Sequence, residues 1–149
     1  MVVPAIVLDA APLGLLAHTR PSAIVLACRQ WQAALIAAGR RIIVPEITDY
    51  EVRRELIRLR RPRAVARLDG LALQLEYLPL TTDAMHLAAE LWAQARQQGQ
   101  PTAPDHALDG DVLLAAQALS LGVPVVVATT NVGHVARFVP AELWPNIKP

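Results

Sequence analysis

Four positions along the chain carry oxygen-bearing side chains of the kind that bind hard metal ions. Asp9 follows an apolar run, Glu51 lies in a charged stretch, and Asp111 opens a stretch rich in Ala and Leu. The fourth position is a polar group that comprises Thr129, Thr130 and Asn131. Carboxylate, hydroxyl and amide oxygens favour Mg²⁺ or Mn²⁺ over Zn²⁺, which prefers His and Cys. A divalent ion held by such groups activates water for phosphodiester hydrolysis.

Each of these residues also has an ordinary structural explanation. Asp9 could form a turn or cap a helix, and Glu51 could be the acid of a capping box that begins at Thr48. Asp109 and Asp111 could stabilise a helix N-terminus, each by roughly 0.3–1 kcal/mol. For Asp109 alone the helix-cap interpretation is favoured. The polar group after the last apolar run could be an ordinary turn, and the four scattered histidines are expected at surface or packing positions.

A parallel sheet would bring the four positions together. The apolar run Val2–Leu8 has the composition of a strand buried on both faces. Further strands are predicted at Arg41–Val44, Glu76–Leu80 and Val123–Ala128, with helical patterns between them, which is typical of an α/β fold with right-handed crossovers. Ligands bind at the carboxyl ends of such strands, and Asp9 would lie at one of them.

The helices are predicted from apolar spacing, capping residues and stop signals. Thr81 or Thr82 caps one of them, and Gly122 stops another. The stretch from Gln97 to Asp105 is polar and contains Pro and Gly, which predicts a loop. Helices are expected over residues 21–38, 48–61, 63–73, 82–98 and 112–121, with a helical turn at 12–16 and an apolar tail that packs back on the sheet.

Length and composition indicate one domain, residues 1–149, with an aliphatic core. Hydrophobic residues make up 54% of the chain, but aromatic residues only 4%. The net charge is +1, yet seven arginines fall between positions 53 and 67, by default on a solvated helix face. Cys28 is the one cysteine, so no disulfide is expected within the chain. No apolar run of membrane-spanning length and no signal-peptide pattern is present, so we expect a cytoplasmic protein that does not enter a membrane.

The chain resembles the PIN domain family, and within it the VapC-type toxins of bacterial toxin–antitoxin pairs. Four segments carry the resemblance in the family's order: Ile6–Ala10, Tyr50–Leu56, Asp111–Ala118 and Val127–Asn131. The resemblance implies a three-layer α/β fold with a central parallel sheet of four to five strands flanked by helices. It also implies an endoribonuclease that depends on Mg²⁺ or Mn²⁺, is often a homodimer, and is inhibited by a small antitoxin protein.

The resemblance also assigns roles to residues. The family's first three acids fall on Asp9, Glu51 and Asp111, and its hydroxyl falls on Thr129 or Thr130. A fourth acid of the family pattern is replaced by Asn131, which leaves the second metal position open, and Asp109 could supply the missing charge. Thr130 and Asn131 would orient water or a carboxylate. The arginines that would contact RNA or the antitoxin are Arg53, Arg54 and Arg58.

Two functions of other classes remain open at this point. The neutral Asn131 is compatible with a binding module that keeps the fold but not the catalysis. A phosphatase with Asp9 as nucleophile ranks lower, because Ala11 replaces the second acid of the usual Asp-x-Asp start. If the chain forms a dimer, the helices that carry Trp31 and Trp92 offer apolar surfaces.

Overall fold

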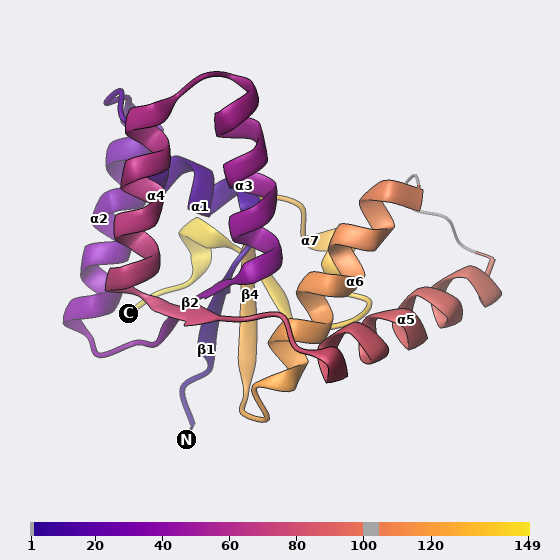
Figure 1. Ribbon diagram of the computed structural model, residues 1–149. Helices are drawn as coiled ribbons and strands as arrows, with labels where there is room; N and C mark the ends of the chain where they lie inside the picture. Colours follow the sequence, from indigo (N-terminus) through magenta and orange to yellow (C-terminus); the bar gives the residue numbers. More distant parts are fainter. Residues whose placement is uncertain (1, 100–104) are drawn as a thin grey trace.

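A five-stranded parallel sheet forms the centre of the computed structural model, which describes residues 2–99 and 105–149 (Figure 1). The strand order is β3-β2-β1-β4-β5, so the first strand of the chain lies in the middle of the sheet. All four pairings between neighbouring strands are parallel. The strands are β1 (Ala5–Leu8), β2 (Ile42–Pro45), β3 (Glu76–Leu78), β4 (Val125–Thr129) and β5 (Ala141–Leu143).

The helices lie between the strands along the chain, as the α/β pattern predicts. The seven among the described residues are α1 (Ala10–Ala17), α2 (Ala23–Ala37), α3 (Glu46–Arg58), α4 (Pro62–Gln74), α5 (Thr82–Gln97), α6 (Asp105–Ser120) and α7 (Val132–Val135). A 3₁₀ turn, Trp144–Asn146, follows β5. The α/β fold class and the parallel sheet are therefore confirmed.

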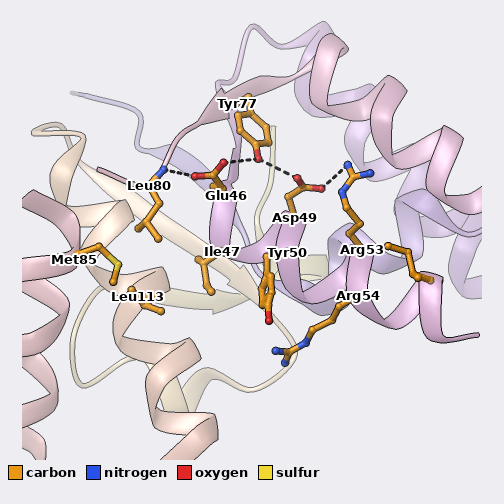
Figure 2. Close-up of a pocket in the computed structure, with 11 residues that line it drawn as sticks. Glu46, Ile47, Asp49, Tyr50, Arg53, Arg54, Tyr77, Leu80, Met85 and Leu113 are labelled. Carbon is orange, nitrogen blue, oxygen red and sulfur yellow. Dashed lines mark hydrogen bonds and ion pairs between the residues drawn. The ribbon is translucent and has the colours of Figure 1, made fainter. Parts of the chain in front are cut away.

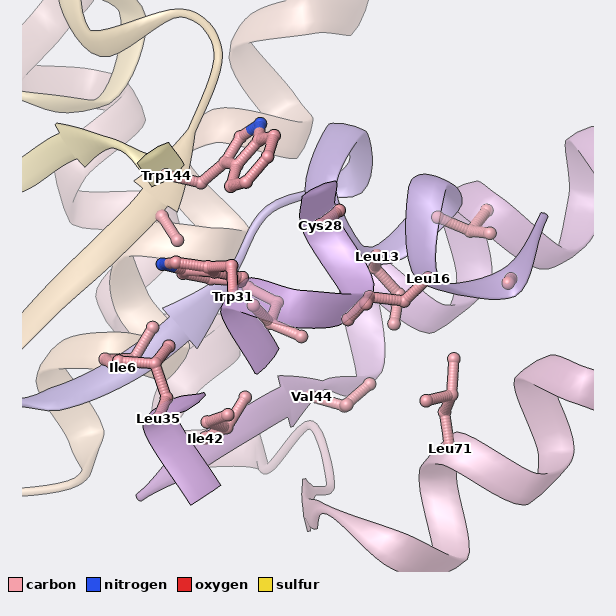
Figure 3. Close-up of a cluster of buried hydrophobic side chains, with 14 of the residues drawn as sticks. Ile6, Leu13, Leu16, Cys28, Trp31, Leu35, Ile42, Val44, Leu71 and Trp144 are labelled. Atoms are coloured by element: carbon pink, nitrogen blue, oxygen red, sulfur yellow. The ribbon is translucent and has the colours of Figure 1, made fainter. Parts of the chain in front are cut away.

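The strands alternate their side chains between two apolar layers. On one face, Ile6 and Leu8 of β1 pack with α1, α2 and α4, as Figure 3 shows for part of this cluster. On the other face, Ala5 and Val7 pack with α6 and the segment after β4. Because both faces are covered, the four residues of β1 are all buried. The helix α5 forms a further apolar contact with α6 on the outer side.

Two local expectations are corrected by the structure, and a third lies partly outside the described residues. The helix predicted to open at Thr48 begins at Glu46, with Pro45 at the N-cap position, so no capping box places Glu51. The helix predicted from position 112 begins at Asp105, so Asp109 lies inside it and does not cap it. Part of the loop expected over residues 97–105 lies outside the described residues.

Trp31 does not offer a free surface. Its side chain is buried in the cluster of Figure 3, where its ring meets Trp144 edge to face with centroids 5.4 Å apart. The indole Nε1 donates to the carbonyl oxygen of Ile147 at 3.0 Å. Trp31 therefore anchors the C-terminal segment to α2.

Within the described ranges, none of the helices combines the length and the apolarity that crossing a membrane requires.

Candidate active site

Asp9 and Thr129 meet because β1 and β4 are neighbouring parallel strands. The register pairs Leu8 with Ala128, so the next residue of each strand emerges at the same edge of the sheet. Asp9 N donates to the carbonyl oxygen of Ala128 at 3.0 Å. The Thr129 hydroxyl donates to Asp9 Oδ2 at 2.7 Å, and Ala10 N donates to Oδ1 at 2.7 Å. Asp9 is thus both the N-cap residue of α1 and an oriented carboxylate at the centre of this edge.

Glu51 reaches the same edge from α3, the helix that follows β2 directly. Its carboxylate lies against the backbone of α6: a Cβ added to Gly110 would stand 3.2 Å from Glu51 Oε1. Burial raises the pKa of Glu51, the negative charges of Asp9 and Asp111 raise it further, and Arg54 opposes the rise. The fold therefore holds Glu51 beside two other acids at a cost to its ionised form.

Asp111 completes the group from α6, one residue after Gly110. Burial raises its pKa to about 6, the charge of Asp9 adds to the rise, and His134 and Arg137 oppose it. Its Oδ2 atom is buried without a hydrogen-bond partner, and His134 Nδ1 stands 3.9 Å away, beyond hydrogen-bonding distance. A buried carboxylate oxygen without a partner is costly, and a cation would relieve that cost.

The three acids suit a divalent ion in charge and in donor type. Burial, followed by the mutual repulsion of the acids, raises the pKa values of Glu51 and Asp111, and hard oxygen donors are what Mg²⁺ and Mn²⁺ prefer. Among the residues that the structure describes, no three Asp, Glu, His or Cys side chains are arranged to hold an ion by themselves. The donor set therefore fits Mg²⁺ or Mn²⁺ in its chemistry, while the three carboxylates are not gathered around one point in this structure.

The fold does not bring every predicted residue to this group. Asp109 is exposed and lines a separate cavity with Met85 and Trp92, between α5 and α6. The hydroxyl that contacts Asp9 belongs to Thr129, whereas Thr130 is exposed. Asp9, Glu51, Asp111 and Thr129 are thus the residues of the predicted site that converge; we call them the carboxylate edge.

Asn131 joins this region through its neighbours. Its backbone N donates to the Thr129 hydroxyl at 3.0 Å, and its side-chain Nδ2 lies 3.3 Å from His134 Nδ1. The sequence places His134 at a surface or packing position, but in the structure it faces Asp111. Its spacing of three residues after Asn131, within one turn of α7, is the signal that could identify it.

The three arginines that are predicted to contact RNA or the antitoxin differ in their partners. Arg53 is paired with Asp49 at 3.0 Å and with Asp69 at 2.8 Å. Arg58 is paired with Glu55. Arg54 lies over the Tyr50 ring, 5.0 Å from its centroid, and is close enough to Glu51 to lower its pKa. Of the three, Arg54 is the one next to the carboxylate edge.

A second group of acids lies on the other side of α3, next to a cavity of about 650 Å³ (Figure 2). The Tyr77 hydroxyl donates to Asp49 Oδ2 at 3.0 Å, and Leu80 N donates to Glu46 Oε1 at 2.9 Å. Nearby, the buried Gln117 of α6 accepts from Ile47 N at 3.0 Å and donates to Leu78 O at 2.9 Å. We call these residues, with Arg53 and Asp69, the polar network: Glu46, Asp49, Arg53, Asp69, Tyr77 and Gln117.

Several solved structures share this fold over nearly the whole chain. A chain in the DNA-bound VapBC2 structure from Rickettsia felis matches with a TM-score of 0.71 at 16% identity, covering 93% of this chain and 97% of that one. DNA-bound VapBC from Salmonella typhimurium gives 0.71 at 23% identity, covering 95% and 99%. VapC20 from Mycobacterium tuberculosis, described as a sarcin-ricin loop cleaving toxin, gives 0.67 at 16% identity, covering 97% and 100%.

Comparison of the sequence with protein families identifies the family, although no curated protein matches this chain. The model of the PIN domain family matches residues 6–137, which is most of the chain and includes all the residues of the carboxylate edge. The chain therefore belongs to the PIN domain family.

Proposed function

We propose that the protein is a divalent-metal-dependent endoribonuclease that acts at the carboxylate edge. One observation carries the proposal: three acids from β1, α3 and α6 converge where two have raised pKa values and Asp111 Oδ2 has no hydrogen-bond partner. Acids so placed are tolerated when a cation neutralises them. Membership of the PIN family supports the same activity.

Asp9, Glu51 and Asp111 would hold Mg²⁺ or Mn²⁺, directly or through water. When bound, the ion supplies an activated water and stabilises negative charge on the phosphate oxygens. Thr129 fixes one oxygen of Asp9, so that this carboxylate keeps its orientation. Arg54 places a positive charge beside Glu51, where it can attract a phosphate. Thr130 and Asn131, which are exposed and follow Thr129 directly, would orient water or a carboxylate.

The biological role that we propose is the toxin of a toxin–antitoxin pair. The solved structures with a similar fold are those of a toxin and of toxin–antitoxin complexes. The expected partners are an RNA substrate, a small antitoxin protein and a second copy of the chain, and the expected location is the cytoplasm, where RNA is accessible. A small open reading frame directly upstream of the gene would support the pairing.

The activity is tested by incubating the purified protein with structured RNAs and Mg²⁺ or Mn²⁺. Wild type should cleave the RNA. Asp9→Asn should lower the cleavage rate by more than the roughly 10–100-fold that is typical when only a group that orients a metal ligand is changed. Asp69→Asn is the matched control, because Asp69 is an acid on α4 that pairs with Arg53 and not with the carboxylate edge. Equal cleavage by wild type and Asp9→Asn would refute the proposed site.

A binding module without catalysis is the second candidate. Asn131 favours it, because its amide is paired with His134 where the family pattern has a fourth acid. This candidate predicts RNA binding without metal-dependent cleavage and without calorimetric heat on addition of millimolar Mn²⁺. Detection of either cleavage or Mn²⁺ binding that depends on Asp9 rejects it.

A further inference from the structure

His134 stands opposite an oxygen of the carboxylate edge that lacks a hydrogen-bond partner. Asp111 Oδ2 is buried, and His134 Nδ1 lies 3.9 Å from it, which is too far for a hydrogen bond. A bridging water with two hydrogen bonds of about 2.8 Å at a tetrahedral angle would hold the two atoms about 4.5 Å apart. Two atoms that bind one divalent ion at about 2.1 Å each lie at most about 4.2 Å apart. The observed separation therefore fits a shared ion better than either alternative.

Packing sets the position of His134. Its neighbour Val135 is 1% exposed and belongs to the same buried cluster as Leu114 and Ala115 of α6, the helix that carries Asp111. At the start of α7, the backbone N of Asn131 donates to the Thr129 hydroxyl at 3.0 Å. The helix α7 is thus tied to β4 and to α6, so the fold places an imidazole at this edge in the same way as it places the carboxylates.

Asn131 determines which nitrogen of the imidazole carries the lone pair. Its side-chain Nδ2 lies 3.3 Å from His134 Nδ1. An amide nitrogen can only donate, so this contact requires a lone pair on Nδ1 and places the ring proton on Nε2. A ring nitrogen with a lone pair is the atom that a metal ion binds. At 3.3 Å the hydrogen bond from Asn131 is long, so a bound ion would displace it at little cost.

A nitrogen ligand changes which ion the site prefers. Carboxylate oxygens suit both Mg²⁺ and Mn²⁺, but imidazole nitrogen suits transition-metal ions, while Mg²⁺ is held by oxygen. With Asn131 in place of an acid, His134 supplies a donor that the three carboxylates lack. No three Asp, Glu, His or Cys side chains of the described residues surround one point. The pair of Asp111 and His134, already at bridging distance, is therefore where an ion would first be held.

We propose that the divalent ion of the carboxylate edge is shared by Asp111 Oδ2 and His134 Nδ1, and that the nitrogen ligand makes the site select Mn²⁺ over Mg²⁺. Asp9 and Glu51 add their charge to the site, directly or through water. The inference rests on the proposed nuclease function for the role of the ion, but it concerns how the ion is bound. A histidine that served only as a charge partner of Asp111 would support both ions alike.

Three substitutions at histidine positions separate these two roles. His134→Gln removes the imidazole and keeps a polar side chain, whereas His134→Asp replaces the nitrogen donor by oxygen. His86→Gln is the matched control, because His86 is exposed on α5, a helix that contributes no residue to the carboxylate edge. Each metal-free protein is titrated by calorimetry with Mn²⁺ and, separately, with Mg²⁺. Thermal melting followed by circular dichroism verifies the fold of each variant.

His134→Gln should weaken Mn²⁺ binding at least about tenfold, since loss of an outer-shell group alone costs roughly 10–100-fold in metal affinity. Its Mg²⁺ affinity should change by less than about twofold, because Mg²⁺ gains nothing from imidazole. His134→Asp should bind Mg²⁺ more tightly than wild type does, because a carboxylate is a hard ligand. His86→Gln should keep both wild-type affinities.

Pulsed electron paramagnetic resonance of the bound Mn²⁺ reads the nitrogen ligand directly. Coupling of the ion to a directly bound nitrogen nucleus should be present in wild type and in His86→Gln. It should be absent from the Mn²⁺ that still binds to His134→Gln or His134→Asp. This signal does not depend on RNA or on cleavage.

Bound Mn²⁺ without nitrogen coupling in wild type overturns the inference. So does an equal loss of Mn²⁺ and Mg²⁺ affinity in His134→Gln, which would leave His134 a charge partner only. Both results leave the nuclease proposal standing if cleavage still depends on Asp9. Conversely, nitrogen-coupled Mn²⁺ in a protein that does not cleave RNA supports the inference and rejects only the nuclease proposal.

Discussion

The carboxylate edge and the polar network both gather acids around α3, yet their electrostatics are opposite. In the polar network, Asp49 accepts hydrogen bonds from Tyr77 and Arg53, and Gln117 uses both ends of its amide. In the carboxylate edge, burial and like charges raise the pKa values of Glu51 and Asp111. Acids that are satisfied by protein groups stabilise the fold, whereas acids left in mutual repulsion indicate a place for an external cation.

The same comparison explains why cavity size alone is a poor guide here. The cavity of about 650 Å³ adjoins the polar network, where Glu46 and Asp49 are engaged with Tyr77, Leu80 and Arg53 (Figure 2). The carboxylate edge adjoins a smaller cavity, but it has the unpartnered Asp111 Oδ2. Substitutions in the two regions should therefore have contrasting effects on stability and on cleavage.

The largest effect on stability is expected from Gln117→Leu in the polar network. This change leaves the buried Ile47 N and the part-buried Leu78 O without their partners, which should cost about 2–4 kcal/mol of unfolding free energy. Urea denaturation measures the loss. Because the side chain of Gln117 bonds to these backbone groups and not to the acids of the carboxylate edge, the folded variant should still cleave RNA. A variant of wild-type stability would show that the polar network is not structural.

Asp111→Asn should instead stabilise the metal-free protein in a pH-dependent way. The folded-state pKa of Asp111 is about 6, above the ordinary 3.8, so the native state retains a proton that the unfolded state loses. The free energy of unfolding of wild type should therefore fall as pH rises from about 4 to about 6, relative to the variant. Above that range Asp111→Asn should be more stable by about 2–3 kcal/mol.

Thermal melting of both proteins across this pH range measures the difference. Addition of Mn²⁺ at neutral pH should remove the deficit of wild type, because the ion stabilises the ionised carboxylate. A stability difference that does not change with pH would show that the ionised form of Asp111 does not destabilise the metal-free fold.

Thr129→Val should lower cleavage without unfolding the protein. The variant keeps the shape of the side chain but loses the 2.7 Å hydrogen bond to Asp9 Oδ2. Loss of a group that orients a metal ligand typically costs roughly 10–100-fold in activity or metal affinity. Thr130→Val is the matched control and should be close to wild type, because Thr130 is exposed. A larger effect at Thr130 would assign the family's hydroxyl to that residue instead.

The smallest effect is expected from Tyr77→Phe in the polar network. Burial, followed by the hydrogen bond to Asp49, raises the pKa of Tyr77 above its ordinary value, so the hydroxyl stays a donor. Its removal should cost about 1 kcal/mol of unfolding free energy. Cleavage and Mn²⁺ binding should be unchanged, and a loss of either would mean that the two regions are coupled through α3.

The sheet can be predicted from sequence because its main strands are continuous apolar runs. Val2–Leu8 and Val123–Ala128 contain β1 and most of β4, and their adjacency places Asp9 beside Thr129. The strand β5 (Ala141–Leu143) is not predicted individually, because its three residues form no apolar run and are only partly covered. Short edge strands depend on pairing with their neighbour rather than on their own sequence.

The local signals around the acids are less reliable. Thr48 and Glu51 have the spacing of a capping box, but the Thr48 side chain is buried inside α3 without a hydrogen-bond partner. Asp109 has the composition of a helix cap, but α6 starts at Asp105. Two residues apart on one helix, Asp109 and Asp111 face different directions, so only one of them can join the carboxylate edge.

Calorimetric titration of the metal-free protein with Mn²⁺ tests the central claim most directly. Wild type and Tyr77→Phe should bind the ion with equal affinity, whereas Asp9→Asn and Asp111→Asn should each lose most of it. Binding that survives both of these substitutions, or no binding by wild type at millimolar Mn²⁺, would contradict a metal site built from the three acids.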